Sequence, residues 1–250
     1  MRHTRFAVLT FGLVLAAAAT SRADDAAVKA VVDKALKAHG GEATLAKLPA
    51  STVTFKGTIH TMGQKVPFTG QVSSQAADKL KIDIEVEAGG QKVRIVNVIN
   101  GDKGWTKFGE DVKELGKDEL TEALEKTHSG WVTTLAPLKN KELTLAPLGE
   151  IKVDDKPAVG IKVTSKGKRD VDLYFDKESG LLVKSETRVK DEGSGQEVTE
   201  ESFYGDYKEV QGTKQSKKIT VKREGKLYVE GEVTDHHLAE RLDDNTFAKP

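Results

Sequence analysis

The sequence contains no cysteine, which excludes disulfide bonds and cysteine-ligated metal sites. Aromatic residues make up only 6% of the chain, and Lys plus Arg balance Asp plus Glu at 39 each. Such a balance provides no basic surface for nucleic acid or for an anionic membrane. We therefore expect a fold that depends on hydrophobic burial and binds no nucleic acid.

The N-terminus has the features of a secretion signal. Arg2 and Arg5 precede a 14-residue apolar run, and small residues surround Ala23 just before an acidic pair. The run is shorter than the roughly 20 residues that cross a bilayer. We predict a signal peptide over residues 1–23, one domain over residues 24–250, and a periplasmic or secreted protein without a membrane span or a lipid-anchor cysteine.

Two short helices are expected before the first strand. Apolar residues recur at steps of three and four between Ala27 and His39, and Gly40-Gly41 ends the pattern because glycine readily takes the left-handed conformation of a helix end. A second helical piece from Glu42 to Leu48 stops before Pro49.

From Thr52 the hydrophobic period changes to two. Leu80, Ile82, Ile84 and Val86 alternate with charged residues, as in a strand with one buried face. About eleven strands are expected, over residues 53–62, 66–74, 79–88, 92–99, 143–148, 159–164, 171–176, 181–189, 198–207, 217–223 and 227–236, together with a short piece at Trp105.

One helix interrupts the strands. It is predicted to begin with Asp118 as its N-cap and to end near Pro137. Its apolar stripe consists of Leu120, Leu124, His128, Trp131 and Leu135, at steps of four, four, three and four.

These elements predict a mainly β protein with a minor helical part. So many strands joined by short turns favour a curled antiparallel sheet, an incomplete and half-open β-barrel. Two helical regions are too few for a sheet with crossovers, so we expect the N-terminal and central helices to be a plug or lid on the concave side. A curled sheet of this size encloses more volume than its own side chains fill.

No motif indicates catalysis, a metal ion or a cofactor. His236 and His237 point to opposite faces of a strand, which is a poor metal site, and a solvated strand end is the preferred interpretation. Gly193-Ser194-Gly195 is a turn instead of a nucleophile elbow, and no phosphate-binding loop occurs. We therefore predict that the protein is not an enzyme.

The candidate ligand-binding residues are side chains expected to line the cavity. Core packing is the alternative for each one, and for His128 a core or lid position is preferred over ligand contact. The set is Ile82, Ile84, Trp105, Leu124, His128, Trp131, Phe175 and Phe203.

Three stretches resemble LolA-like outer-membrane lipoprotein-sorting proteins. The strand from Asn97 turns through Asn-Gly-Asp into Trp105. The stretch from Val171 to Glu186, followed by Phe203 to Val210, is similar to that family's aspartate–glycine turn, rising strand and later Asp-Tyr strand. The layout also resembles a group of secreted planctomycete-type proteins, and the resemblance covers roughly residues 50–236.

The resemblance implies a half-barrel whose apolar cavity shields acyl chains from water, in a superfamily that binds lipids or protein partners. Ser216 stands where the family often has proline, and no cargo-binding residue is transferred. We expect a periplasmic or secreted protein that binds a hydrophobic small molecule or acyl chain, as a lipid or lipoprotein carrier does. The alternative is a non-enzymatic envelope module with a filled barrel and a protein partner. An envelope hydrolase would need a polar cluster that no spacing predicts.

Overall fold

The computed structural model describes residues 15–61, 63–191 and 193–250, without the side chains of residues 15–23 and 88. Thirteen strands in this part form one antiparallel sheet, in the spatial order β6-β5-β4-β3-β2-β1-β13-β12-β11-β10-β9-β8-β7. The strands are β1 (Ala50–Thr61), β2 (Gln64–Gln75), β3 (Lys79–Ala88), β4 (Gln91–Asn100), β5 (Lys103–Phe108), β6 (Asp111–Glu114), β7 (Leu143–Val153), β8 (Lys156–Ser165), β9 (Val171–Asp176), β10 (Leu182–Lys190), β11 (Glu197–Val210), β12 (Thr213–Arg223) and β13 (Lys226–Ala239).

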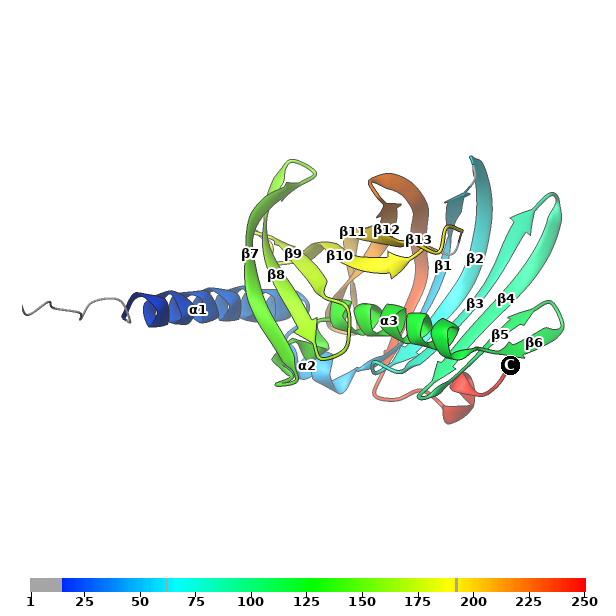
Figure 1. Ribbon diagram of the computed structural model, residues 1–250, viewed down its shortest axis with the longest axis horizontal. Coiled ribbons are helices and arrows are strands. Elements are labelled where there is room, and N and C mark those ends of the chain that lie inside the picture. The colour runs from blue at the N-terminus through cyan, green and yellow to red at the C-terminus, as the bar shows by residue number, and fades with distance from the viewer. Residues whose placement is uncertain (1–14, 62, 192) are drawn as a thin grey trace, which may run out of the picture.

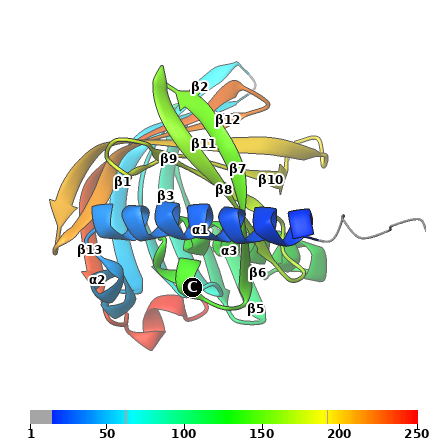
Figure 2. The same cartoon turned by 90° about the vertical axis from the view of Figure 1, so that its left-hand side faces the viewer.

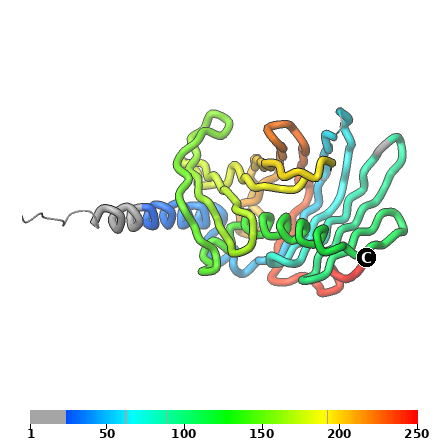
Figure 3. Tube along the Cα trace, viewed as in Figure 1, coloured from blue at the N-terminus to red at the C-terminus, as the bar shows by residue number. Residues whose placement is uncertain are grey.

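The order of the strands explains the position of the central helix. Strands β6 and β7 are consecutive among the strands of the chain but form the two opposite edges of the sheet. Helix α3 (Lys117–Thr133) and the short η1 (Ala136–Lys139) connect them. The connection crosses the concave side of the curled sheet, where α3 lies (Figures 1 and 3). The predicted lid is therefore a consequence of topology.

Helices α1 (Leu15–Ala38) and α2 (Glu42–Lys47) precede the sheet, and η2 (Asp244–Phe247) follows it. Figure 2 shows α1 crossing β7. We call the concave face of the sheet, which carries Val53, Leu173 and Tyr204, the inner face. The main core fills the inner face at the β7–β10 end, where Val32 of α1 and Val132 of α3 pack on Leu173 and Phe175.

The outer face carries two smaller clusters. In one, Val96, Val98 and Trp105 pack against Phe247 of η2. In the other, Phe203 packs against a cluster that includes Val153, Ala158 and Tyr174. Side chains on both faces of this sheet therefore have apolar partners.

The predicted fold class is confirmed: a curled antiparallel sheet that does not close, with helices on its concave side. The prediction missed β6, whose four residues are all exposed and have no alternating pattern. The N-cap of α3 is Gly116 instead of Asp118, because the Glu119 carboxylate accepts a hydrogen bond from the Gly116 N–H at 2.7 Å.

The first helix begins earlier than predicted, at Leu15, so α1 passes through the expected cleavage position. Residues 1–14 of the expected signal peptide lie outside the described residues. In the part of the chain that the structure describes, no helix is long and apolar enough to cross a membrane.

Candidate ligand-binding cavity

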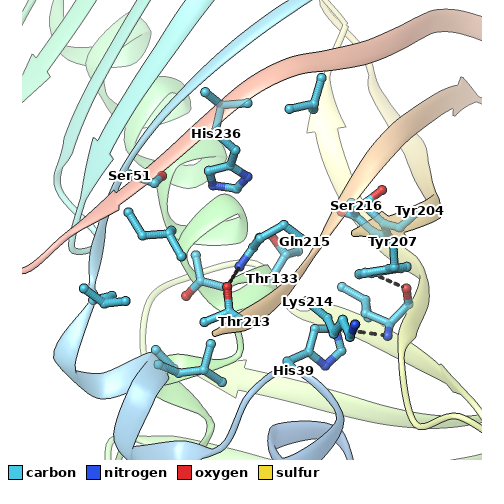
Figure 4. A pocket seen from close by; sticks show the side chains of 18 of the residues that line it. His39, Ser51, Thr133, Tyr204, Tyr207, Thr213, Lys214, Gln215, Ser216 and His236 are labelled. Atoms are coloured by element: carbon cyan, nitrogen blue, oxygen red, sulfur yellow. Dashed lines mark hydrogen bonds between the residues drawn. The ribbon is translucent and has the colours of Figure 1, made fainter. Parts of the chain in front are cut away.

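A cavity of about 190 Å³ opens on the inner face, between α2, the end of α3 and strands β1 and β11 to β13 (Figure 4). Its walls are mostly apolar. They consist of inner-face residues of adjacent strands and of residues that follow α1 and α3. The apolar lining includes Leu45, Val53, Ile219, Val233 and Leu238. A mostly apolar hollow with a few polar groups is typical of small-molecule sites.

The aromatic and imidazole groups at one end of this cavity are uncharged at neutral pH. Burial lowers the pKa of His39, although its hydrogen bond to the Ala35 carbonyl acts in the opposite direction. Burial also raises the pKa of Tyr204 and Tyr207. The Tyr204 hydroxyl lies 2.9 Å from Ser185 Oγ.

His236 points into the cavity from β13 (Figure 4). It pairs in register with Val53 of β1 on the inner face. Its Nδ1 is buried and has no hydrogen-bond partner. Burial, assisted by the charge of Lys217 and opposed by that of Asp235, lowers the pKa of His236 to about 4. The ring is therefore neutral at pH 7.

A second cavity of about 230 Å³ shares Thr133 and Tyr204 with the first. Its lining is polar and includes Lys126 and Ser129 of α3 and Glu200 and Arg223 of the sheet. Arg223 Nε donates to Glu200 Oε2 at 2.9 Å, and its guanidinium stacks 3.7 Å from the ring centre of Tyr228. The charge of the arginine is thus already compensated within the protein.

The two sides of α3 have different surroundings. Trp131 and Val132 pack on the main core and anchor the helix. The small and polar residues Ser129, Gly130 and Thr133 line the second cavity instead. Polar residues on this helix therefore face a cavity that the sheet encloses.

An apolar wall extends along the inner face from β1 to β5. Ile82 and Ile84 of β3 pair with Val72 and Gly70 of β2 on this face, and both isoleucines are only half-buried. At the far end of the wall, Phe108 is 59% exposed. Apolar side chains on a concave surface thus remain in contact with water.

The eight residues predicted to line the cavity occupy three kinds of place, and none of them lines either of the two cavities. Ile82 and Ile84 belong to the adjacent apolar wall. Phe175, 1% exposed, lies in the main core, and Trp131 packs against it. His128 is buried beside Trp131, with ring centres 5.7 Å apart, while Leu124 is half-buried on the same helix.

Trp105 and Phe203 differ from the prediction because both lie on the outer face. Trp105 packs in the cluster of Val96, Val98 and Phe247, and Phe203 in the cluster of Tyr174. Their large apolar area requires burial, but an antiparallel sheet covered on both faces offers that burial on either side. Residue type alone therefore could not assign the face.

The sequence interpretation missed His236, which it placed at a solvated strand end. A signal was available: His236 lies two residues before Leu238, so the alternation of a strand puts the two side chains on one face. Leu238 is buried and lines the same cavity. His237 is exposed, as the opposite-face argument predicts.

Among the described residues, no group of three or more His, Asp or Glu side chains is placed to hold a metal ion. The functional features of the inner face are thus two cavities, an apolar wall and one histidine with an unpartnered nitrogen.

An open, curled antiparallel sheet with a helix across its concave side is the fold of LolA-like structures. No known family profile matches the sequence, and no curated protein matches it. Solved structures share the fold, among them the following three. A LolA superfamily protein from Nitrosomonas europaea is 15% identical, with 89% of this chain and 97% of that chain covered and a TM-score of 0.55.

The second is a putative outer membrane lipoprotein-sorting protein domain from Vibrio parahaemolyticus, at 11% identity, 88% and 95% coverage and a TM-score of 0.56. The third is a DUF1329 family protein from Desulfovibrio piger, at 13% identity, 88% and 97% coverage and a TM-score of 0.58. At these identities the likeness concerns the fold, and at that level the resemblance to LolA-like proteins is confirmed.

Proposed function

We propose that this chain is a periplasmic or secreted binding protein that holds a lipid-like or other hydrophobic molecule on the concave side of its sheet, without chemistry on it. The observation that carries the proposal is the half-exposed apolar wall of β1 to β5, continuous with an open, mostly apolar cavity. The names of two similar structures, a LolA superfamily protein and a lipoprotein-sorting domain, agree with a role in handling lipid-modified or lipid-like cargo.

The energetics of the wall support this proposal. Apolar surface that stays in water is unfavourable by about 25 cal/mol per Å² relative to burial. Ile82, Ile84 and Phe108 keep part of their surface in water. A hydrophobic guest on this wall would bury that surface, and α3 above it would limit the access of water.

The alternative is a protein-interaction module whose interior is filled. Phe175 and the end of α3 do fill the β7–β10 end of the inner face. The two cavities and the wall at the other end are not filled by side chains, which favours a bound small molecule.

Native mass spectrometry of the purified protein tests the proposal first. We expect a lipid-sized mass that is released on denaturing extraction, or that is acquired after incubation with a lipid extract. A bare polypeptide mass under both conditions would refute the ligand-binding proposal and favour the protein-interaction module.

A matched pair of variants tests the location of the ligand. Ile84→Gln puts an amide on the inner face, whereas Glu85→Gln puts the same side chain on the outer face of the same strand. Half-burial of an isoleucine against ligand is equivalent to about 1 kcal/mol, or roughly fivefold in affinity. We expect that loss for a fluorescent naphthylamine probe with Ile84→Gln only. Equal affinities of the two variants would place the ligand elsewhere.

A further inference from the structure

The Nδ1 atom of the half-buried His236 is unusual among the buried polar atoms of the described residues. Only two buried side-chain nitrogen or oxygen atoms in this part of the chain lack a hydrogen bond, Asp172 Oδ1 and His236 Nδ1. Asp172 Oδ1 lies 2.9 Å from Lys162 Nζ and so has a counter-charge. His236 Nδ1 has no such counter-charge among the described residues, and the ring points into the cavity (Figure 4). Because buried polar atoms are nearly always bonded, this nitrogen needs a partner that the described protein groups do not supply, which is a water molecule or a ligand group.

The other polar groups around the cavity are mostly occupied by protein partners. Thr213 Oγ1 donates to the Val210 carbonyl at 2.8 Å, and Ser216 Oγ donates to the Gly205 carbonyl at 2.8 Å. Gln215 Nε2 donates to Thr213 Oγ1 at 3.0 Å, which leaves the amide oxygen of Gln215 as an acceptor (Figure 4). The His236 ring and the amide oxygen of Gln215 are therefore among the uncharged polar groups that the cavity lining can offer to a guest.

The charges around His236 disfavour an ionised guest. Besides His236, the titratable groups that line the cavity are His39, Tyr204, Tyr207 and Lys214. Among these, Lys214 has its own carboxylate partner, since its Nζ lies 3.6 Å from an oxygen of the exposed Glu209. Three charged or titratable neighbours also act on the ring, Lys217 and His237 against its cationic form and Asp235 in favour of it.

A carboxylate or phosphate next to a neutral imidazole would be buried without its own cation, which is strongly unfavourable. An uncharged hydroxyl group has no such penalty. It both donates and accepts, so it can pair with a neutral imidazole nitrogen in either tautomer and donate to an amide oxygen.

We propose that His236 binds the hydroxyl end of a single-chain amphiphile, such as a monoacylglycerol or fatty alcohol. The apolar chain then follows the inner wall from Val53 toward Ile82 and Ile84. The cavity of about 190 Å³ exceeds the roughly 10–15 Å³ that one water needs by more than tenfold, enough for a small headgroup. This inference rests on the proposed ligand-binding function and specifies the class of its ligand.

Competition titrations with the purified full chain at pH 7.5 test the inference. In these titrations, 1-monolauroylglycerol, laurate or dodecane competes with a fluorescent naphthylamine probe for the protein. We expect monolauroylglycerol to bind about tenfold more tightly than laurate, since a hydrogen bond in an apolar cavity is worth about one order of magnitude. His236→Phe should remove that preference. The matched control His237→Phe alters the exposed neighbour on the other face and should retain it.

His236→Asn separates the loss of a hydrogen bond from a folding defect, because asparagine keeps a donor and an acceptor in the cavity. This variant should retain part of the preference for monolauroylglycerol over laurate. A second readout is the ¹⁵N spectrum of the imidazole rings. We expect monolauroylglycerol to shift one ring-nitrogen resonance that is missing in His236→Phe, and dodecane to leave it in place.

The failures of the two proposals are distinguishable. If the wild-type chain binds neither the probe nor any of the three ligands, the proposed function itself fails. If it binds all three equally and His236→Phe changes nothing, the apolar wall alone holds the ligand and the role of His236 is refuted. Tighter binding of laurate than of monolauroylglycerol would also overturn it.

Discussion

His39 and Tyr207 lie edge to face, with ring centres 5.6 Å apart, and both bind the backbone of Leu182. The Tyr207 hydroxyl donates to the Leu182 carbonyl at 2.6 Å, and His39 Nε2 accepts from the Leu182 N–H at 3.5 Å. A β-bulge follows Leu182, and the pairing of β10 with β11 begins only at Lys184. The two side chains thus bind the backbone groups of Leu182 where pairing with β11 has not yet begun, and both line the cavity.

The first prediction concerns the hydrogen bond from Tyr207 to the Leu182 backbone. Tyr207→Phe leaves the buried Leu182 carbonyl without its donor, and an unsatisfied buried group is destabilising by about 1–3 kcal/mol. We expect that decrease in the free energy of unfolding, measured by urea denaturation. Tyr228→Phe is the control, because its ring stacks on Arg223 and does not need the hydroxyl for that contact. Equal losses in the two variants would contradict a special role of Tyr207.

The second prediction is a loss of stability on mild acidification. Burial lowers the pKa of His39, His128 and His236 in the folded protein, that of His236 to about 4. The unfolded chain therefore binds more protons than the folded one below the ordinary value of about 6.5. Stability is full above that pH and falls as the pH is lowered from 6.5 toward 4, by at most about 1.4 kcal/mol per pH unit for each histidine.

Urea denaturation at pH 8, 6.5 and 5 measures this slope. Paired carboxylates such as Asp83, whose pKa is lowered chiefly by its hydrogen bond from Arg94, also lose their contribution on acidification, but near and below their ordinary values of about 4. The window between pH 6.5 and 5 therefore reports mainly on the histidines. A stability that stays flat there would show that these rings accept protons in the folded state.

The sequence was sufficient for the fold because alternation is a local signal. The alternation from Leu80 to Val86 predicts that the apolar residues share one face. The structure places these apolar residues on the inner face. The cavity could not be predicted in the same way. Its polar lining from α3, such as Ser129 and Thr133, has the pattern of a solvated helix side, and only the crossing from β6 to β7 turns it inward.

The assignment of faces failed for a related reason. Trp105 pairs with Val98 on the outer face, and Phe247, 142 positions later in the chain, covers both residues there. Contacts of such sequence separation leave no trace in the local pattern. His236 is the intermediate case, since its face was predictable from Leu238 but its missing partner was not.

The third prediction concerns a glycine in a strand. A Cβ atom on Gly57 would lie 2.7 Å from Phe68 Cζ and would also clash with the Glu230 carbonyl of the neighbouring strand. The Phe68 ring occupies the space above Gly57, and backbone cannot easily move away. We expect Gly57→Ala to be destabilising by about 1–3 kcal/mol, as for other overpacked sites. Gly205→Ala, in β11 with no atom within 4 Å of its Cβ position, should change little, and equal effects would argue against the close approach.

The last prediction concerns the attachment of α3, on which access to the inner face depends. The Arg169 guanidinium donates to both carboxylate oxygens of Glu122, at 3.0 and 2.6 Å, and to Glu197 of β11 at 2.7 Å. The Arg169 N–H also donates to the buried Glu125 at 2.9 Å. One residue of the β8–β9 loop therefore links two carboxylates of the helix to the sheet.

Arg169→Ala removes the guanidinium and leaves Glu122 and Glu197 facing each other without it, and such partly buried pairs contribute about 1–3 kcal/mol. We expect amide hydrogens of α3 to exchange faster, the β1 and β13 amides to change less, and the naphthylamine probe to associate faster. Arg241→Ala is the matched control, because its pair with Asp244 is 65% exposed on both sides and contributes little. If exchange in Arg169→Ala increases equally in α3 and in the sheet, α3 opens only when the whole protein unfolds, and a ligand must reach the inner face past a fixed helix.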